Sequence, residues 1–218
     1  KPVAVISIDS KAFTMRVAKL IQKKQKESDK GIKLIHMVAP TVWAWRPGRA
    51  KNISKFLDHL LTLFPFEPPF FTRYGLPTTF IGHPLAEQPV GCSSVYRNIH
   101  DVDEATKIIS LLPGSRPGEI KRLLPTFKKT LDLLIKKYPN IHIAMPTVVS
   151  VKGMLRRETL GWKTPVSIIT DPEMKLNALA ASSVALAASG TVTLELALAK
   201  VPSVIAYKVN PLSAIIGY

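Results

Sequence analysis

Short apolar runs alternate along this chain with segments in which apolar residues recur every three or four positions. The first run, residues 3–8, precedes a segment with helical spacing formed by Phe13, Val17, Leu20 and Ile21. Uninterrupted apolar runs of this length indicate buried parallel strands, and the periodic segments between them indicate crossover helices. The alternation predicts further strands at residues 32–38, 59–64, 78–81, 107–112, 141–145, 166–169, 184–188 and 203–207. We therefore expect an α/β fold with parallel sheets.

The alternation stops between residues 86 and 106, where glycine, serine and acidic residues replace the periodic apolar positions. We interpret residues 91–106 as a linker between a domain at 1–90 and a second domain at 107–218. Two series of strands and helices joined in this way predict two Rossmann-like domains. In the second, an apolar stripe from Ile120 to Tyr138 predicts a long helix, which we expect Pro125 to kink or break.

Residues 176–194 contain no charged side chain and approach the length of a membrane span. The run nevertheless contains Asn177 and several serine and threonine residues, and it divides into a helix, a strand and a turn. We therefore expect any membrane contact of this chain to be peripheral.

Composition narrows the classes of partner. The chain has 218 residues and a formal net charge of +15, with the basic excess spread over both halves. Such a charge suits nucleic acid, an anionic membrane surface or phosphorylated substrates. Neither zinc-finger spacing nor an aromatic RNA-binding motif is present, so we expect no nucleic-acid partner. The single cysteine, Cys92, excludes an internal disulfide and suits a reducing cytoplasm.

Two turns in the second half have the pattern of anion sites. Ser189, Gly190 and Thr191 separate a predicted strand from a predicted helix, where backbone N–H groups and the helix dipole favour an anion. Glu195, in the first turn of that helix, is either an acceptor for a sugar diol or a complement to the dipole. A second turn contains Gly114-Ser115-Arg116, which adds a guanidinium to the same pattern. Neither turn has the P-loop or the GxGxxG spacing.

The first half offers a carboxylate and an aromatic loop. Asp9 follows the first strand at its carboxyl end, where ligands bind in open α/β sheets. The loop 39–49 contains Trp43, Trp45, Arg46 and Arg49. It either packs back on its domain or presents a surface to a ring, a phosphate or a lipid interface, and we favour the second interpretation. We expect His83, at another strand end, to be structural.

Five segments resemble one family, both in their amino-acid sequences and in their order along the chain. They are Pro40-Thr41-Val42-Trp43-Ala44-Trp45-Arg46-Pro47-Gly48-Arg49, Phe64-Pro65-Phe66-Glu67, Ile81-Gly82-His83-Pro84-Leu85, Leu112-Pro113-Gly114-Ser115-Arg116 with Glu119-Ile120, and Ala188-Ser189-Gly190-Thr191 with Thr193-Leu194-Glu195. Together they resemble the lipid-A-disaccharide synthases, inverting glycosyltransferases of family 19 with the GT-B fold. The resemblance covers nearly the whole chain.

The resemblance implies a bacterial enzyme of lipid A biosynthesis. Its donor would be UDP-2,3-diacylglucosamine, its acceptor 2,3-diacylglucosamine 1-phosphate, and its products a β-1,6 disaccharide and UDP. It implies no metal and no cofactor. It also implies a peripheral location at the cytoplasmic face of the inner membrane of a Gram-negative bacterium, where a basic surface would meet anionic lipid.

The resemblance also assigns roles to individual residues. Asp9 matches the aspartate expected to deprotonate the acceptor 6-hydroxyl. Arg116, with Gly114 and Ser115, matches the donor diphosphate contact. The remaining donor-binding residues by this resemblance are Ser189, Gly190, Thr191 and Glu195. The tryptophan loop is a candidate acceptor or membrane loop without an assigned chemical role.

The chain departs from the family pattern in two respects. Ser10-Lys11-Ala12-Phe13 follows Asp9, so Lys11-Ala12 stands in place of the family's usual Pro-Asp before Phe13. A second carboxylate is therefore missing, and a lysine lies nearby. The family pattern also begins well before Lys1 and continues beyond Tyr218. We therefore expect the first domain to be incomplete at its start and the chain to be incomplete at its end. Two alternatives stay open: another UDP-sugar enzyme, such as an epimerase, and a truncated, non-catalytic remnant that binds anionic membrane.

Overall fold

The computed structural model describes residues 2–26 and 31–208. The chain divides into two compact units, Lys1–Glu87 and Gln88–Tyr218. The two ends of the chain, to which the expectation of incompleteness refers, lie outside the described residues. Both units contain parallel sheets with crossover helices, so the predicted α/β fold is confirmed.

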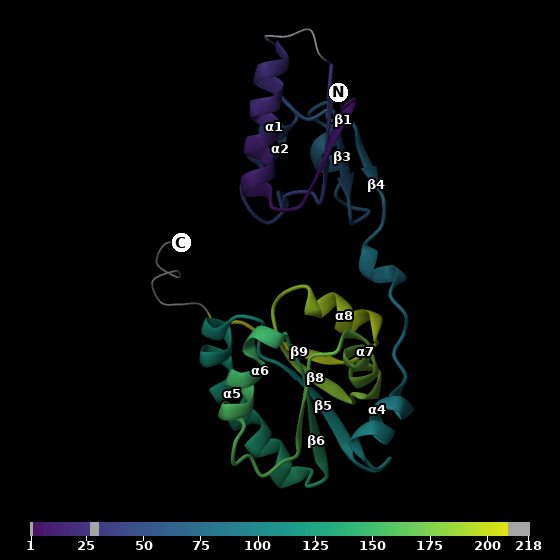
Figure 1. Cartoon of the computed structure of the whole chain (residues 1–218), viewed down its shortest axis with the longest axis vertical. Helices are drawn as coiled ribbons and strands as arrows, with labels where there is room; N and C mark the ends of the chain where they lie inside the picture. Colours follow the sequence, from purple (N-terminus) through teal and green to yellow (C-terminus); the bar gives the residue numbers. More distant parts are fainter. Residues whose placement is uncertain (1, 27–30, 209–218) are drawn as a thin grey trace. The chain divides into compact units, whose positions relative to one another are not determined.

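Unit 1 contains a four-stranded parallel sheet in the order β1-β2-β3-β4. Figure 1 labels three of these strands, β1, β3 and β4. Its elements are β1 (Ala4–Ile8), α1 (Lys11–Lys26), β2 (Lys33–Met37), α2 (Gly48–Ile53), β3 (His59–Thr62), α3 (Pro69–Thr72), β4 (Thr78–Phe80) and the short 3₁₀ helix η1 (Pro84–Glu87). The four strands lie at the positions predicted from the sequence, whereas η1 was not predicted.

The core of unit 1 joins its helices to the sheet. Ala18 of α1, Ala50 of α2 and Leu60 of β3 belong to one buried cluster. The edge strand β1 differs, because Ile6 and Ile8 are 61% and 62% exposed. The apolar sequence of β1 predicted a buried strand. The structure shows instead that one face of this strand is exposed.

Unit 2 contains a five-stranded parallel sheet in the order β7-β6-β5-β8-β9. Its elements are α4 (Ser93–His100), β5 (Lys107–Leu112), α5 (Pro117–Lys137), β6 (Ile141–Pro146), α6 (Val149–Glu158), β7 (Val166–Ile169), α7 (Pro172–Ala181), β8 (Val184–Ala188), α8 (Val192–Leu198) and β9 (Ser203–Ala206). The chain starts the sheet at β5, builds outward through β6 and β7, then returns to add β8 and β9 on the other side. The point where the strand order reverses therefore lies between β5 and β8.

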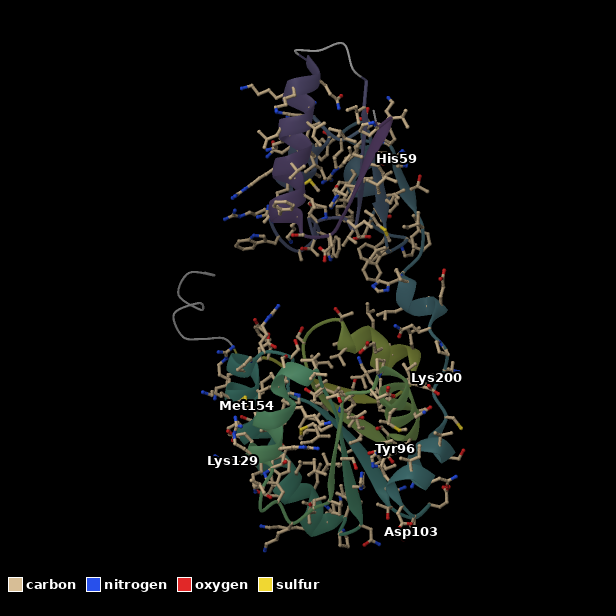
Figure 2. All side chains as sticks on the ribbon, viewed as in Figure 1. His59, Tyr96, Asp103, Lys129, Met154 and Lys200 are labelled. Atoms are coloured by element: carbon tan, nitrogen blue, oxygen red, sulfur yellow. The ribbon has the colours of Figure 1, made fainter. Side chains whose placement is uncertain are left out.

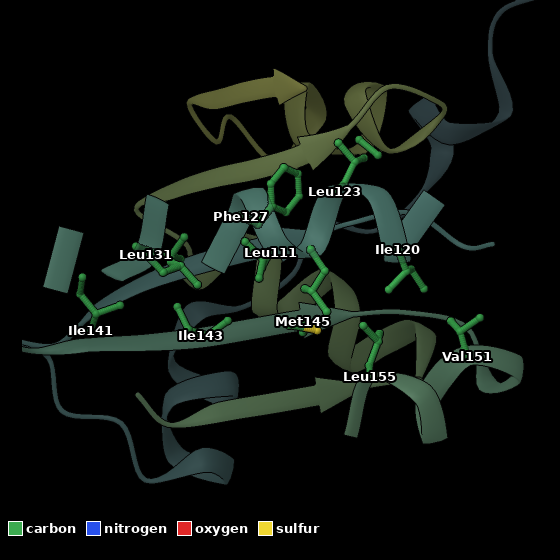
Figure 3. Close-up of a cluster of buried hydrophobic side chains, with 13 residues drawn as sticks. Leu111, Ile120, Leu123, Phe127, Leu131, Ile141, Ile143, Met145, Val151 and Leu155 are labelled. Atoms are coloured by element: carbon green, nitrogen blue, oxygen red, sulfur yellow. The ribbon is translucent and has the colours of Figure 1, made fainter. Parts of the chain in front are cut away.

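Helix α5 packs its apolar stripe on one face of this sheet, together with α6 (Figure 3). Leu123, Leu124 and Phe127 are buried on either side of Pro125. The helix continues through Pro125, so the predicted break does not occur. An interior proline costs about 3 kcal/mol, whereas each fully buried Leu or Phe contributes about 1.5–3 kcal/mol. Burial on both sides of the proline outweighs the lost backbone hydrogen bond.

The segment predicted to be a linker contains helix α4, which packs on α7 in unit 2. Tyr96, labelled in Figure 2, is fully buried, and the backbone N–H of Cys92 donates to Asn177 Oδ1 at 2.7 Å. A Cβ on Gly91 would lie 2.1 Å from the carbonyl oxygen of Leu176, so this contact requires glycine. One buried aromatic among polar residues produces no periodic pattern, which is why the sequence suggested a linker.

A hydrogen-bonded network fixes α4 to the sheet. Tyr96 Oη lies 3.1 Å from His142 Nε2, and Ser167 Oγ lies 3.0 Å from both His142 Nε2 and His100 Nδ1. Burial, assisted by the nearby His100 and Arg97, lowers the pKa of His142 from 6.5 to about 4. His142 is therefore neutral in folded unit 2 at physiological pH.

We expect this network to make unit 2 sensitive to acid. Since the unfolded chain binds a proton on His142 below pH 6.5 and the folded unit does so only near pH 4, acidification across this window should lower the free energy of unfolding by about 3 kcal/mol. Trp162 is the single tryptophan of unit 2, so its fluorescence during urea unfolding reports this unit in a Trp43→Phe/Trp45→Phe background.

His142→Gln should flatten that pH dependence, whereas His59→Gln, on β3 of unit 1, should leave it unchanged. An acid dependence equally steep in His142→Gln would contradict the assignment.

Candidate active site

A cavity of about 360 Å³ lies in unit 2 at the carboxyl ends of the strands, at the point where the strand order reverses. In open α/β sheets this is the position at which ligands bind. The turns after β5, β6 and β8 form its walls. The lining residues include all seven donor-binding residues predicted from the sequence: Gly114, Ser115, Arg116, Ser189, Gly190, Thr191 and Glu195.

The turn after β5 places a guanidinium at the cavity. Gly114 has φ +112°, and a Cβ there would lie 2.6 Å from Glu119 Oε2, so only glycine fits. Arg116 precedes helix α5, and its Nη1 lies 3.1 Å from Glu119 Oε1. The Arg116 side chain is 79% exposed. Its cationic end is therefore accessible to a ligand while Glu119 restricts its direction.

The turn after β8 lines the cavity with a glycine, so no side chain lies between the cavity and the backbone at this point. Gly190 has φ +154°, and a Cβ built there would meet nothing within 4 Å. Thr193 Oγ1 donates to the Gly190 carbonyl at 2.8 Å, which ties the turn to the first residues of α8. Helix α8 has seven residues. Two cationic side chains, Arg116 and Lys175, line the same cavity as this turn.

Glu195 forms an ion pair that the sequence did not predict. Lys175 Nζ, from helix α7, lies 2.7 Å from Oε1 and 2.6 Å from Oε2 of Glu195. Both residues line the cavity. The sequence suggested that Glu195 is either a diol acceptor or a complement to the helix dipole. Neither alternative included the ion pair with Lys175. No local motif marks Lys175; only the packing of α7 beside α8 brings it here.

Thr147 is a second cavity residue that the sequence did not single out. It directly follows β6, and its backbone N–H donates to the Ile169 carbonyl at 2.7 Å. Its hydroxyl is buried and has no hydrogen-bond partner among the described residues. A buried hydroxyl without a partner is costly, so Thr147 Oγ1 is a candidate ligand contact. The signal available in the sequence was its place at a strand end.

Asp9 belongs to unit 1, where it follows β1. Its N–H donates to the Met37 carbonyl at 3.0 Å, and its carbonyl accepts a hydrogen bond from Thr14 Oγ1 at 2.9 Å. Asp9 and Ser10 have φ values of 48° and 45°, a left-handed conformation that costs free energy in residues other than glycine. The surrounding hydrogen bonds maintain this turn and leave the carboxylate exposed.

A buried histidine lies beside this turn. His36 Nδ1 lies 2.8 Å from Ser7 Oγ, and its Nε2 has no hydrogen-bond partner among the described residues. Burial lowers the pKa of His36, and the negative charge of Asp9 partly opposes that shift. Asp9 therefore faces a neutral imidazole, and no described salt bridge contains Asp9.

The tryptophan loop has both structural and exposed members. Trp43 packs edge-on against Phe66, with ring centroids 5.1 Å apart, whereas Trp45 is 51% exposed. The Arg46 guanidinium lies 5.3 Å from the Trp45 ring centroid. Arg49 lines a separate cavity in unit 1. The loop thus packs back on its unit through Trp43 and presents Trp45 and Arg46 to its surroundings.

Two further residues of the family segments have structural contacts. His83 Nδ1 accepts a hydrogen bond from the Leu85 N–H at 3.2 Å, in line with the structural interpretation. Glu67 is 2% exposed and accepts hydrogen bonds from the N–H groups of Leu63 and Phe64. Burial raises the pKa of Glu67. Both residues shape the loops that follow β3 and β4.

Within residues 2–26 and 31–208, no group of three or more His, Cys, Asp or Glu side chains could hold a metal ion. The same residues contain no helix that is long and apolar enough to cross a membrane.

Fold comparison defines the class of protein. The fold of parallel sheets with crossover helices is similar to that of UDP-GlcNAc 2-epimerase from Neisseria meningitidis, with TM-score 0.63 and 12% identity over 99% of this chain and 62% of that one. UDP-GlcNAc 2-epimerase from Methanocaldococcus jannaschii gives TM-score 0.58 and 15% identity over 99% of this chain and 64% of that one. The chain therefore has the GT-B type of fold found in sugar-nucleotide enzymes.

Sequence comparison defines the family within that class. The family model described as lipid-A-disaccharide synthetase matches residues 1–218. Lipid-A-disaccharide synthase from Rhodospirillum centenum is 46% identical over 97% of this chain and 52% of its own length. That from Gluconobacter oxydans is 41% identical over 100% of this chain and 51% of its length. The chain belongs to the lipid-A-disaccharide synthase family, and it spans about half the length of the curated relatives it matches.

Proposed function

We propose that this protein transfers 2,3-diacylglucosamine from UDP to 2,3-diacylglucosamine 1-phosphate, forming a β-1,6 disaccharide and releasing UDP. The observation that carries the proposal is the cavity of unit 2, which joins the two anion turns predicted from the sequence. Membership of the lipid-A-disaccharide synthase family supports the reaction and the identity of the substrates.

The donor would bind in this cavity. Arg116 and Lys175 would meet the diphosphate, and the turn at Ser189, Gly190 and Thr191 would contribute backbone N–H groups. Negative charge grows on the leaving UDP as the glycosidic bond breaks. Cationic groups already placed around the diphosphate would stabilise the transition state more than the ground state.

The acceptor would be activated by Asp9. Its exposed carboxylate lies at the carboxyl end of β1, and as general base it would remove the proton of the acceptor 6-hydroxyl as that oxygen attacks the donor sugar. His36 is buried beside Asp9, and its Nε2 donates to no described acceptor. Because burial lowers the pKa of His36, the imidazole would be neutral and would not offset the negative charge of the Asp9 carboxylate. Inversion at the anomeric carbon would follow from this single displacement.

The membrane contact would be peripheral, at the cytoplasmic face of the inner membrane. Both substrates are anionic lipids, and the chain carries a net charge of +15. Trp45, half exposed beside Arg46, has the amphipathic character favoured at membrane interfaces.

We expect Lys175→Met to weaken the binding of UDP to the 218-residue chain by at least about tenfold, which corresponds to about 1.4 kcal/mol. The change removes a cation from the cavity and leaves the Glu195 carboxylate unpaired beside the diphosphate. Isothermal titration calorimetry with UDP measures the effect. Lys136→Met, in the last turn of α5, removes an equal charge from outside the cavity and should leave the affinity unchanged. Equal weakening by both variants would contradict the donor site.

A different UDP-sugar reaction is the second candidate, because UDP-GlcNAc 2-epimerases share this fold. Acceptor dependence separates the two. In the complete protein, release of UDP from UDP-2,3-diacylglucosamine should require 2,3-diacylglucosamine 1-phosphate. Turnover of the donor alone would favour an epimerase. If the chain sediments with anionic liposomes but does not bind UDP, the result would favour a non-catalytic remnant that binds membrane.

A further inference from the structure

A second cavity, of about 310 Å³, lies within unit 1 between helices α1 and α2. Its walls combine two kinds of side chain. Met15, Ile53 and Phe56 are apolar, whereas Lys11, Lys19 and Arg49 are cationic. None of the described acidic residues of unit 1, which are Asp9, Asp58, Glu67 and Glu87, lines it. The volume is at the lower end of the range of small-molecule sites, about 300–1,000 Å³.

The contacts of unit 1 hold these walls in place. Gln22 Nε2 of α1 donates to the Lys55 carbonyl at 2.7 Å, which ties α1 to the segment after α2. Lys19 Nζ lies 5.2 Å from the centroid of the Phe56 ring, so one cation is fixed against an apolar wall. In the described part of the chain, Lys11, Lys19 and Arg49 take part in no salt bridge. Their charge is therefore available to a ligand.

We propose that this cavity binds a phosphate monoester that carries an alkyl chain, with the phosphate at Lys11, Lys19 and Arg49 and the start of the chain against Met15, Ile53 and Phe56. Three unpaired cations beside an apolar wall match the charge and the amphipathic character of such a ligand. Lys11, which stands with Ala12 in place of the family's usual Pro-Asp after Asp9, is one of these cations.

The identity of the ligand rests on the proposed function, since the acceptor is an acylated sugar with a phosphate. Lys11 is two residues after Asp9, so their Cα atoms are at most about 7 Å apart. A phosphate held at Lys11 would leave the other hydroxyls of the same sugar within reach of the Asp9 carboxylate. The cavity would thus select the phosphorylated acceptor and orient its 6-hydroxyl.

The test uses the 218-residue chain and decyl phosphate at concentrations at which it is monomeric. Calorimetry should show saturable binding at a ratio of one to one. Inorganic phosphate, which lacks the chain, and decyl maltoside, which lacks the charge, should each bind at least tenfold more weakly. Saturable binding of inorganic phosphate with equal affinity would overturn the role of the apolar wall.

A pair of double variants isolates the cavity from the general basic charge. Lys11→Gln/Arg49→Gln should weaken binding of decyl phosphate at least tenfold. Lys23→Gln/Lys51→Gln makes the same charge change on the same two helices outside the cavity and should have no effect. Circular dichroism checks that both variants fold. Equal weakening by the two pairs would overturn the proposal, as would binding to phosphatidylglycerol vesicles without binding to monomeric decyl phosphate.

The donor-site variant Lys175→Met separates this inference from the proposed function. It should bind decyl phosphate like the unaltered chain, because Lys175 belongs to unit 2. A complete protein that binds decyl phosphate but shows no acceptor-dependent release of UDP would overturn the proposed transferase function. The same result would support the proposed ligand site in the unit 1 cavity. Acceptor-dependent release without binding of decyl phosphate would do the reverse.

Discussion

Asp9→Asn should lower the acceptor-dependent release of UDP by the complete protein by about 10²–10⁴-fold while leaving its affinity for UDP unchanged. Asparagine keeps the size and polarity of the side chain but does not accept a proton at neutral pH. The cavity proposed to bind the donor lies in unit 2, and Asp9 does not line it. Initial rates at saturating donor and acceptor, together with a UDP titration, measure the two quantities.

Asparagine is the suitable replacement because of the backbone at this turn. Asp9 has φ 48°, and asparagine tolerates the left-handed conformation better than alanine does. A loss of rate in Asp9→Asn therefore reports the lost carboxylate and not a rebuilt turn. Glu87→Gln, an exposed acid in η1, is the matched control and should retain the full rate. A near-normal rate in Asp9→Asn would remove Asp9 from the role of base.

Arg116→Met should lower kcat by about 10²–10³-fold, the usual effect of losing one group that stabilises developing negative charge. Its Nη1 contacts Glu119, but the side chain is 79% exposed, so little packing is lost with the guanidinium. Arg116→Lys should recover part of the rate, because lysine keeps the charge and loses the planar fork that can hold two phosphate oxygens. Steady-state kinetics with varied donor give kcat and KM separately.

The control for Arg116 is another exposed arginine of unit 2. Arg157, in the last turn of α6, does not line the cavity, and Arg157→Met should leave kcat unchanged. A rise in KM at constant kcat in Arg116→Met would show that the guanidinium binds donor and transition state equally. That result would exclude its role in stabilising the leaving group.

The strands of this chain could be predicted because parallel strands are continuous apolar runs. Residues 107–112 and 166–169 were predicted as strands, and the structure has the same bounds for β5 and β7. Helix α7 and its cap at Asp171 were also predictable, since Asp171 precedes Pro172 and accepts from the Met174 N–H. Helix α4 was not, because its burial depends on Tyr96 alone.

The candidate site was predictable only where chemistry is local in sequence. The turns at Gly114 and Gly190 combine glycine with a strand end and a helix start, a pattern visible in one segment. Lys175 and Thr147 belong to the same cavity but are unremarkable in their own segments. Their place depends on the strand order β7-β6-β5-β8, which no single segment encodes. The cations of the unit 1 cavity likewise come from two helices that only tertiary packing brings together.

The left-handed turn at Asp9 and Ser10 has a consequence for attempts to make this protein more heat-resistant. Glycine at position 10 would relieve an unfavourable backbone conformation, so selection for thermostability alone would favour it. The same change would let the Asp9 carboxylate sample orientations that do not serve the proposed reaction. Screens of improved variants should therefore score turnover alongside melting temperature at this position.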